Sequence, residues 1–140
     1  MEFQILENKL TPEDFIRLKV ATGFRDRPIR QVEKALDNDL LDVVAVINDE
    51  IVGMGRLVGD GMYFTIVDVV VRPEYQGKGV GSAIIKSMLD YIGNSTYEGS
   101  RVSVQLISEV GKEEFYIKQG FKLIPHEFCG PALRKIIYKD

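Results

Sequence analysis

One stretch constrains the fold more than any other, because a buried strand runs into a glycine-rich loop and then into a helix. Residues 63–71 are almost all aromatic or β-branched. A strand that is apolar on both faces is typical of a sheet covered on both sides. Pro73 cannot donate a ladder hydrogen bond, so the strand ends before it. After the glycines an apolar residue recurs at every fourth position, which predicts an amphipathic helix: Val80, Ile84, Met88 and Ile92.

The glycine-rich loop covers residues 76–82, Gln-Gly-Lys-Gly-Val-Gly-Ser. Glycines at the start of a helix leave its first N–H groups uncovered, and these groups, with the helix dipole, can bind a phosphate. A nucleotide P-loop is excluded because no glycine of the loop is followed directly by Lys-Ser or Lys-Thr. The dinucleotide fingerprint fits poorly, since Ser82 stands where it needs Gly or Ala. The pattern Gln-x-x-Gly-x-Gly does fit, with Gln76, Gly79 and Gly81.

The periodicity of the whole chain predicts the element order β α α β β β α β α β β. We therefore expect an α/β fold with a mixed, mostly antiparallel sheet and helices on both faces. All 140 residues are expected to form a single domain. The expected strands are 3–6, 41–47, 51–58, 63–71, 101–107, 121–124 and 133–138. The expected helices run from Pro12 to near Gly23, after Pro28, after the glycine loop, and from Ser108 to Gln119. Thr11 is expected to cap the first helix, and Gly120 to adopt a left-handed conformation beyond the last, so that Phe121 folds back on it.

The loop and the Val-x-Pro-x-Tyr stretch before it closely resemble the acetyl-CoA loop of the GNAT superfamily of N-acyltransferases. Residues 115–121, Phe-Tyr-Ile-Lys-Gln-Gly-Phe, resemble a second motif of that family. The resemblance implies the GNAT fold over residues 1–140, acetyl-CoA as co-substrate, no metal, and direct attack by an amine. It also implies that the strand's backbone pairs with the pantetheine arm and the loop binds the pyrophosphate. The expected coenzyme-binding residues are Val69, Val70, Val71, Gln76, Gly77, Lys78, Gly79, Val80, Gly81 and Ser82.

Two residues are candidates for proton transfer. By its motif position, the resemblance implies that Tyr116 protonates the leaving thiolate, since a phenol with a pKa of about 10 is protonated at neutral pH. The alternative is a core tyrosine that only packs. Asp68 interrupts an apolar strand and, by alternation, is expected on one face with Phe64, Ile66 and Val70. Such a carboxylate could serve as the base for the substrate ammonium, or as a structural carboxylate bonded to backbone groups at a strand irregularity. Many relatives carry Glu in this strand.

The acceptor side of the fold is expected to include the loop between the first two helices, residues 23–28. It offers one apolar contact, two cations and one anion, Asp26. The arginines could hold an acidic group on a small amine, or they could form surface ion pairs that contribute little. The acidic residues Asp60 and Asp68 would attract a cationic amine. The expected substrate-binding residues are Phe24, Arg25, Arg27, Tyr63 and Thr65.

Composition limits the other classes of function. The net charge of −3 and the lack of a basic run argue against nucleic acid. No apolar run reaches the roughly 18 residues that span a bilayer, and residues 1–4 do not read as a signal peptide. The single cysteine, Cys129, fits a reducing cytoplasm, and His126 is more typical of an exposed loop than of a base.

The partner is therefore expected to be a small-molecule or peptide amine, and a homodimer is compatible with this interpretation. No cluster of residues has metal-ligand spacing. The rival hypothesis is a module that binds acyl-CoA as a sensor or docking domain and catalyses nothing.

Overall fold

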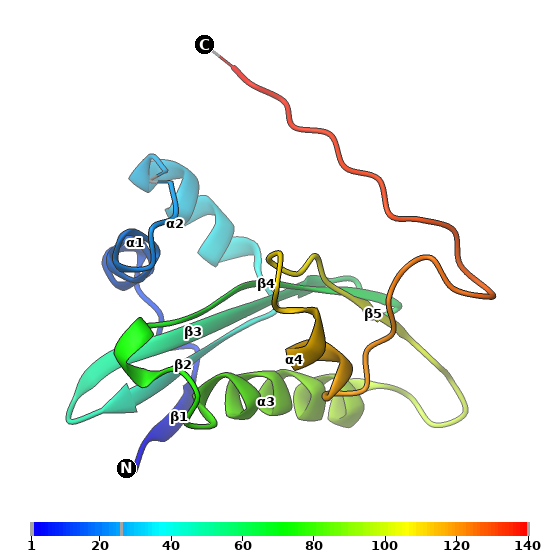
Figure 1. Cartoon of the computed structure of the whole chain (residues 1–140), viewed down its shortest axis with the longest axis horizontal. Helices are drawn as coiled ribbons and strands as arrows, with labels where there is room; N and C mark the ends of the chain where they lie inside the picture. Colours follow the sequence, from blue (N-terminus) through cyan, green and yellow to red (C-terminus); the bar gives the residue numbers. More distant parts are fainter. Residues whose placement is uncertain (1, 26, 140) are drawn as a thin grey trace. The chain divides into compact units, whose positions relative to one another are not determined.

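The computed structural model describes residues 2–25 and 27–139 (Figure 1). The chain divides into two compact units: an N-terminal unit that ends at Leu106 and a C-terminal unit that begins at Ile107. Each unit is described by itself.

The N-terminal unit is built on a five-stranded sheet in the order β1-β2-β3-β4-β5. The first four strands pair antiparallel with their neighbours, and β5 pairs with β4 in parallel. The mixed, mostly antiparallel sheet that the sequence predicts is therefore confirmed. The strand bounds are β1 Gln4–Glu7, β2 Leu41–Ile47, β3 Glu50–Gly59, β4 Tyr63–Val71 and β5 Ser103–Gln105.

Helix α3 (Val80–Ser95) covers one face of the sheet. It buries the predicted stripe of apolar residues, including Ile84 and Met88, which are fully buried. Glycine on β3 permits this close packing, because a Cβ on Gly55 would lie 2.7 Å from Ile84 Cγ2 and 2.9 Å from Met88 Cε. Gly53 meets the same helix, with Ile84 Cδ1 at 3.2 Å from the position of its missing Cβ.

Helices α1 (Pro12–Ala21) and α2 (Ile29–Asn38) lie on the other face (Figure 1). The Thr11 side chain caps α1 by accepting from the Asp14 N–H, as the sequence predicts. The two helices contribute Phe15, Leu18 and Val32 to a core that includes Met54 and Val70 from the sheet. Helices on both faces, with the expected sheet between them, confirm the predicted α/β class.

The central strand β4 carries an irregularity at Asp68. Met54 pairs with Val70 and Arg56 pairs with Val67, so β4 has one residue more than β3 over this interval. Asp68 adopts φ +55°, in the left-handed region, and forms the resulting β-bulge. The expected face of Asp68 is therefore wrong in part. The extra residue breaks the alternation, so Asp68 lies with Val70 on the side of α1 and α2, whereas Phe64 and Ile66 face α3.

The C-terminal unit contains a shorter helix than the sequence predicts. Helix α4 covers Glu113–Ile117, and Ser108 does not cap it. Gly111 adopts φ +91°, and the Lys112 N–H donates to the Glu109 carbonyl, so a turn occupies the place of the expected first helical turn. Gly120 does adopt the predicted left-handed conformation, with φ +95°, just beyond the helix.

The two predicted C-terminal strands, 121–124 and 133–138, are wrong, since the described residues 121–139 contain no strand. One isolated bridge joins His126 and Cys129 there. Apolar side chains in this segment are largely exposed, with Leu133 at 93% and Ile137 at 85%. Alternating apolar residues favour a strand only where a partner supplies the ladder, and this segment has none among the described residues.

Candidate functional site

The glycine loop gives the start of α3 a backbone geometry that can accept an anion. Gly77 and Gly79 adopt φ +74° and +88°, and a Cβ on either would meet nothing within 4 Å. The glycines are therefore needed for their backbone conformation and leave open space in front of the loop. Gly79 is the N-cap of α3 and no side chain caps it. The first amides of the helix thus have no acceptor within the helix, which is the arrangement that binds phosphate groups.

A glutamine side chain joins this loop to the end of β4. Gln76 Nε2 donates to the Val71 carbonyl oxygen at 2.8 Å. The 3₁₀ turn η1 (Pro73–Tyr75) lies between them, and the Gln76 N–H donates to the Pro73 carbonyl. The predicted loop residue Gln76 therefore fixes the distance between the strand and the glycines.

The edge of β4 next to this loop is open within the N-terminal unit. The ladder between β4 and β5 covers three pairs and ends at Thr65↔Gln105. Over Ile66–Val71, the ladders of this unit pair β4 with β3 alone. Backbone groups on an unpaired strand edge can accept an extended ligand as an added strand. The residues predicted to pair with the coenzyme arm, Val69–Val71, lie on this edge.

The carboxylate of Asp68 is held by two cations. Arg56 Nε and Nη2 each lie 3.0 Å from Asp68 Oδ2, and Lys19 Nζ lies 2.9 Å from Oδ1. All three side chains are mostly buried, with exposed fractions of 10%, 17% and 14% for Arg56, Asp68 and Lys19. The irregularity that the structural alternative required is present, but side-chain cations, and not backbone groups, are the partners of the carboxylate.

Arg56 extends the cluster to α2. Its Nη1 lies 3.4 Å from Asp39 Oδ2 and 3.3 Å from the Ala35 carbonyl oxygen. Burial raises the pKa of Asp39 above its ordinary value, although Arg56 acts in the opposite direction. Burial likewise raises the pKa of Asp42, which accepts from the Leu10 N–H at 2.9 Å. We call the four side chains Lys19, Arg56, Asp68 and Asp39 the bulge cluster.

Lys19 also brings the acceptor loop to the bulge. Its Nζ lies 4.3 Å from the centre of the Phe24 ring and 5.8 Å from that of Phe15. Phe24 and Asp68 were predicted as site residues from separate parts of the chain, and this lysine contacts both. Phe24 is 39% exposed, so part of its ring can meet a substrate.

The other predicted acceptor residues are spread over the same unit. Arg25 and Arg27 are exposed in the loop after α1, and Asp26 lies outside the described residues. Tyr63 is 63% exposed and Thr65 is half-buried, and both lie on the face opposite Phe64, as predicted. Asp60 is exposed, and hydrogen bonds from the Tyr63 and Met62 N–H groups lower its pKa.

Tyr116 belongs to the C-terminal unit and lies on α4. Its ring packs edge-on against Phe115 and Phe121, with ring centres 4.9 Å and 6.1 Å away. The Phe121 N–H donates to the Tyr116 carbonyl, so Phe121 folds back on the helix as predicted. Burial, and secondarily the charge of Glu109, raise the pKa of Tyr116 above 10. The phenol therefore keeps its proton at neutral pH and is available as a donor.

The comparison with protein families decides the classification. A family model for the GNAT acetyltransferase domain matches residues 41–123, more than half of the chain. The chain belongs to the GNAT acetyltransferase family. The matched residues contain the glycine loop, the bulge and Tyr116.

Individual GNAT relatives agree with this classification. An uncharacterised ycf52-like N-acetyltransferase of Prochlorococcus marinus is 37% identical over 78% of this chain and 61% of its own length. A probable acetyltransferase from meticillin-resistant Staphylococcus aureus superposes with a TM-score of 0.82 at 32% identity, covering 96% of this chain and all of that one. A GNAT family acetyltransferase of Streptococcus pneumoniae gives 0.76 at 29% identity, covering 99% and 98%. The chain spans about three-fifths of the length of the curated relatives it matches.

His126 and Cys129, the lone histidine and cysteine, form a turn with each other. The backbone groups of His126 and Cys129 bond each other in a turn, and His126 Nδ1 accepts from the Phe128 N–H at 3.2 Å. Within residues 2–25 and 27–139, no three His, Cys, Asp or Glu side chains gather into a group that could hold a metal ion. Over the same residues, no helix has the length and apolar character needed to cross a bilayer.

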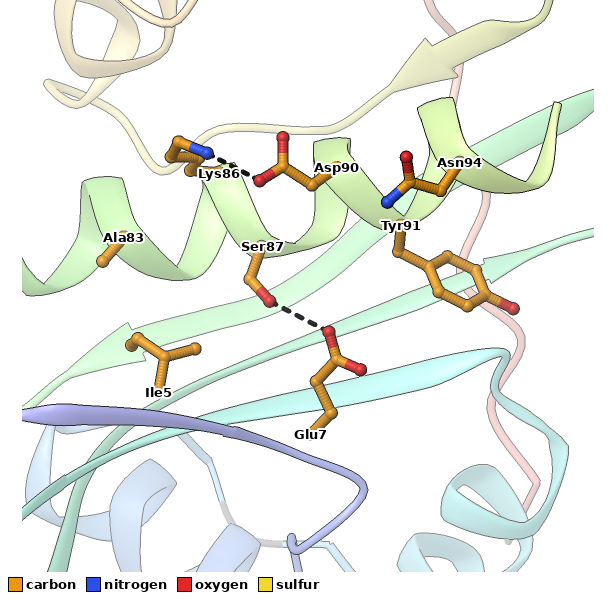
Figure 2. A pocket seen from close by; sticks show the side chains of 8 residues that line it. All are labelled: Ile5, Glu7, Ala83, Lys86, Ser87, Asp90, Tyr91 and Asn94. Atoms are coloured by element: carbon orange, nitrogen blue, oxygen red, sulfur yellow. Dashed lines mark hydrogen bonds and ion pairs between the residues drawn. The ribbon is translucent and has the colours of Figure 1, made fainter.

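A separate hollow of about 420 Å³ lies between β1 and α3 (Figure 2). Four of its polar side chains are paired with each other: Lys86 with Asp90 at 2.6 Å, and the Ser87 hydroxyl with Glu7 at 3.4 Å. None of the predicted site residues lines it. We therefore place the candidate GNAT site at the loop and the open β4 edge, and not in this hollow.

Sequence reasoning missed Arg56, Lys19 and the two packing glycines. One signal was available for Arg56: a cation interrupts the apolar strand 51–58 and an anion interrupts the next strand. Opposite charges that interrupt neighbouring apolar strands predict a buried ion pair. Lys19 gives no such signal, because it reads as an ordinary solvated residue on an amphipathic helix.

Proposed function

We propose that this chain transfers an acetyl group from acetyl-CoA to a primary amine by direct attack of the amine on the thioester. GNAT acetyltransferases use acetyl-CoA and act on amines, and the chain carries the parts that such a reaction needs. Direct transfer without an acyl-enzyme asks the protein to position the reactants, polarise the thioester carbonyl and move two protons.

One observation carries the proposal: the uncapped start of α3 and the open edge of β4 belong to the same unit and are joined by Gln76. The first can bind the pyrophosphate and the second the pantetheine arm. Coenzyme A carries both groups, so a single ligand would use both features. We propose that Val69–Val71 and Gln76–Ser82 hold it.

We propose Tyr116 as the group that protonates the departing thiolate. Its raised pKa supports this role, because a donor must hold its proton until the leaving group develops charge. Tyr116→Phe removes the proton and keeps the ring that packs against Phe115 and Phe121. The expected result is a decrease in kcat of up to about 100-fold, with little change in coenzyme affinity. If kcat survives and the basic limb of the pH–rate profile stays in place, Tyr116 only packs.

Asp68 has two candidate roles, proton acceptor or holder of the β4 bulge. Its ion pairs with Arg56 and Lys19 occupy both carboxylate oxygens and support the second role. A base must be within reach of the proton it accepts, and here both oxygens already bind a buried cation.

We propose that the acceptor is a small amine that also carries an acidic group. Arg25 and Arg27 stand in the loop that Lys19 joins to the bulge through Phe24, and a guanidinium can grip a carboxylate or phosphate in bidentate fashion. A simple amine, a polyamine or a peptide N-terminus would need no such cations and is the alternative.

An amine panel assayed by thiol release tests the proposed function. Purified protein, acetyl-CoA and amines with and without an acidic group are mixed, and release of free thiol is compared with coenzyme alone. Calorimetry with acetyl-CoA is run in parallel. Release that depends on an amine supports the transferase. Tight coenzyme binding without turnover on any amine supports a sensor or docking module instead, and no binding at all contradicts both.

A further inference from the structure

A strained residue lies directly beside the backbone proposed to hold the coenzyme arm. Asp68 adopts φ +55° and precedes Val69–Val71 on the open edge of β4. A residue other than glycine stays in the left-handed region only where its surroundings hold it there. The question is therefore what holds Asp68, and what would change if it were released.

The bulge cluster holds it from three other elements. Arg56 on β3 and Lys19 on α1 each bind one oxygen of the carboxylate, at 3.0 and 2.9 Å. Arg56 is fixed in turn by Asp39 and the Ala35 carbonyl at the end of α2. The Phe15 ring lies 5.8 Å from the Arg56 guanidinium carbon and from Lys19 Nζ. Neither oxygen of Asp68 is left to move without breaking a buried charged contact.

Loss of the bulge would change the strand that follows it. A β-bulge adds one residue, and removing it shifts the pairing by one residue and turns each side chain to the other face. Val70 would then leave the core it shares with Met54 and Phe15. The same shift would exchange the backbone N–H and C=O groups that Val69–Val71 present on the open edge.

We propose that Arg56 and Lys19 are positioning residues for acetyl transfer: acting through Asp68, they hold the β4 bulge in the shape that presents Val69–Val71 to the coenzyme. This inference rests on the proposed function. Lys19 also packs on Phe24, so the same ammonium fixes the start of the acceptor loop relative to the bulge. Asp68 is a positioning residue in this arrangement and not the base.

Two substitutions at Asp68 separate the roles. Asp68→Ala removes the carboxylate and disfavours the left-handed conformation, so acetyl-CoA affinity should decrease by about tenfold or more in calorimetry. Asp68→Asn keeps an acceptor oxygen and a residue that tolerates this conformation. It should recover most of the lost affinity and turnover, with the acid limb of the pH–rate profile unchanged. Loss of turnover in Asp68→Asn at unchanged affinity identifies a base and overturns the inference.

Lys19→Met provides a test that does not depend on a buried aspartate. Methionine keeps the unbranched stem over Phe24 and removes the charge, so the variant should fold. The amide resonances of Val69–Val71 in the free protein should shift, and acetyl-CoA affinity should fall by about threefold or more. Arg17→Met is the matched control on α1, because Arg17 pairs with Asp14 and Glu50 instead. It should leave those resonances and the affinity as they are.

The outcomes distinguish this inference from the proposed function. A wild-type protein that binds no acetyl-CoA contradicts the proposed function before any variant is made. Binding in the wild type, with unchanged affinity and unchanged Val69–Val71 resonances in folded Lys19→Met, overturns the positioning role alone. If Asp68→Ala does not fold, Asp68→Asn and Lys19→Met still decide the matter.

Discussion

The two faces of the central sheet differ in the side chains that they bury. The face under α3 is apolar and closely packed, with Gly53 and Gly55 of β3 against Ile84 and Met88. The face under α1 and α2 has an apolar core of its own but also buries the ion pairs of Arg56. Dispersion and the exclusion of water hold α3 on the first face. On the second face, part of the packing depends on buried ion pairs, in which each charge needs a partner of opposite sign close by.

This difference indicates that the two faces of the sheet have different roles. Close packing without charges gives α3 one fixed position, which suits a helix whose first amides are proposed to bind a phosphate. Buried charges cost desolvation and contribute little net stability, so their presence is better explained by what they position than by what they stabilise. The charged face is also the one that holds the bulge.

The largest expected effect tests the start of α3. Gly81→Val places a branched side chain at the second position of this helix, beside the amides proposed to meet the pyrophosphate. Acetyl-CoA affinity should fall by at least about 100-fold in calorimetry while circular dichroism shows a folded protein. Gly93→Val is the control, because Gly93 lies in the same helix and a Cβ there meets nothing within 4 Å. Equal affinity in the two variants contradicts a pyrophosphate site at this end.

The next largest effect is expected from a substitution that disrupts packing on the apolar face itself. Gly55→Val forces a side chain into the space of Ile84 and Met88, whose atoms would lie 2.7 and 2.9 Å from the new Cβ. Overpacking of this kind should lower the free energy of unfolding by about 1–3 kcal/mol. Urea denaturation measures it, with Gly93→Val as the control in open space. A Gly55→Val protein as stable as the wild type would show that α3 moves aside freely.

A smaller effect is expected from the two arginines of the acceptor loop. Replacing Arg25 and Arg27 with Gln removes two cations from the acceptor loop. The KM for amines that carry an acidic group should rise by about tenfold, and the KM for simple amines should change little. A constant KM for every accepted amine means that the arginines do not hold substrate, and a simple amine becomes the better candidate.

The smallest effect concerns the pH dependence of stability on the charged face. Burial raises the pKa of Asp42 above 3.8, so the folded state binds a proton more tightly than the unfolded state. The stability this gives is fully present below the unfolded pKa and is lost as pH rises through the raised one. Asp42→Asn keeps an oxygen for the Leu10 N–H and does not titrate.

The stability of Asp42→Asn relative to the wild type should therefore increase from about pH 4 to about pH 7, by about 1 kcal/mol. Urea denaturation at several pH values measures the difference. Asp39 titrates in both proteins. Burial raises its pKa and the charge of Asp42 raises it further, so the substitution also removes this smaller contribution at Asp39. A difference that does not vary with pH contradicts the burial argument.

Sequence reasoning predicted most of the N-terminal unit because its signals are local. The bounds of β2 and β4 match the structure residue for residue, since each strand is a mostly apolar run between clear breaks. The loop and α3 follow from the glycines and the four-residue spacing. A strand irregularity at Asp68 was one of two alternatives, but the sequence could not decide between them, because one extra residue leaves no mark on a mostly apolar strand until the partner strand is known.

The C-terminal unit shows the opposite case. Its apolar residues suggested two strands, but a strand exists only through its ladder, and residues 121–139 form none among the described residues. The candidate site residues also differ in whether local sequence signals could reveal them. Tyr116 and the loop could be found from motifs, whereas the contacts of Asp68 depend on Lys19 and Arg56, which lie far from it in the sequence.

The glycines of β3 and those of the coenzyme loop would respond differently to a library of single substitutions. Gly77 and Gly79 have open space around them but positive φ, so Asn and Asp should be the best tolerated replacements there. At Gly53 and Gly55 the space is filled, so tolerance should decrease with side-chain volume whatever the residue's backbone preference. Tolerance at Gly77 and Gly79 would then depend on the residue's backbone preference, and tolerance at Gly53 and Gly55 on its size. The substitutions accepted at each glycine would therefore show whether it shapes the loop or allows the helix to pack closely.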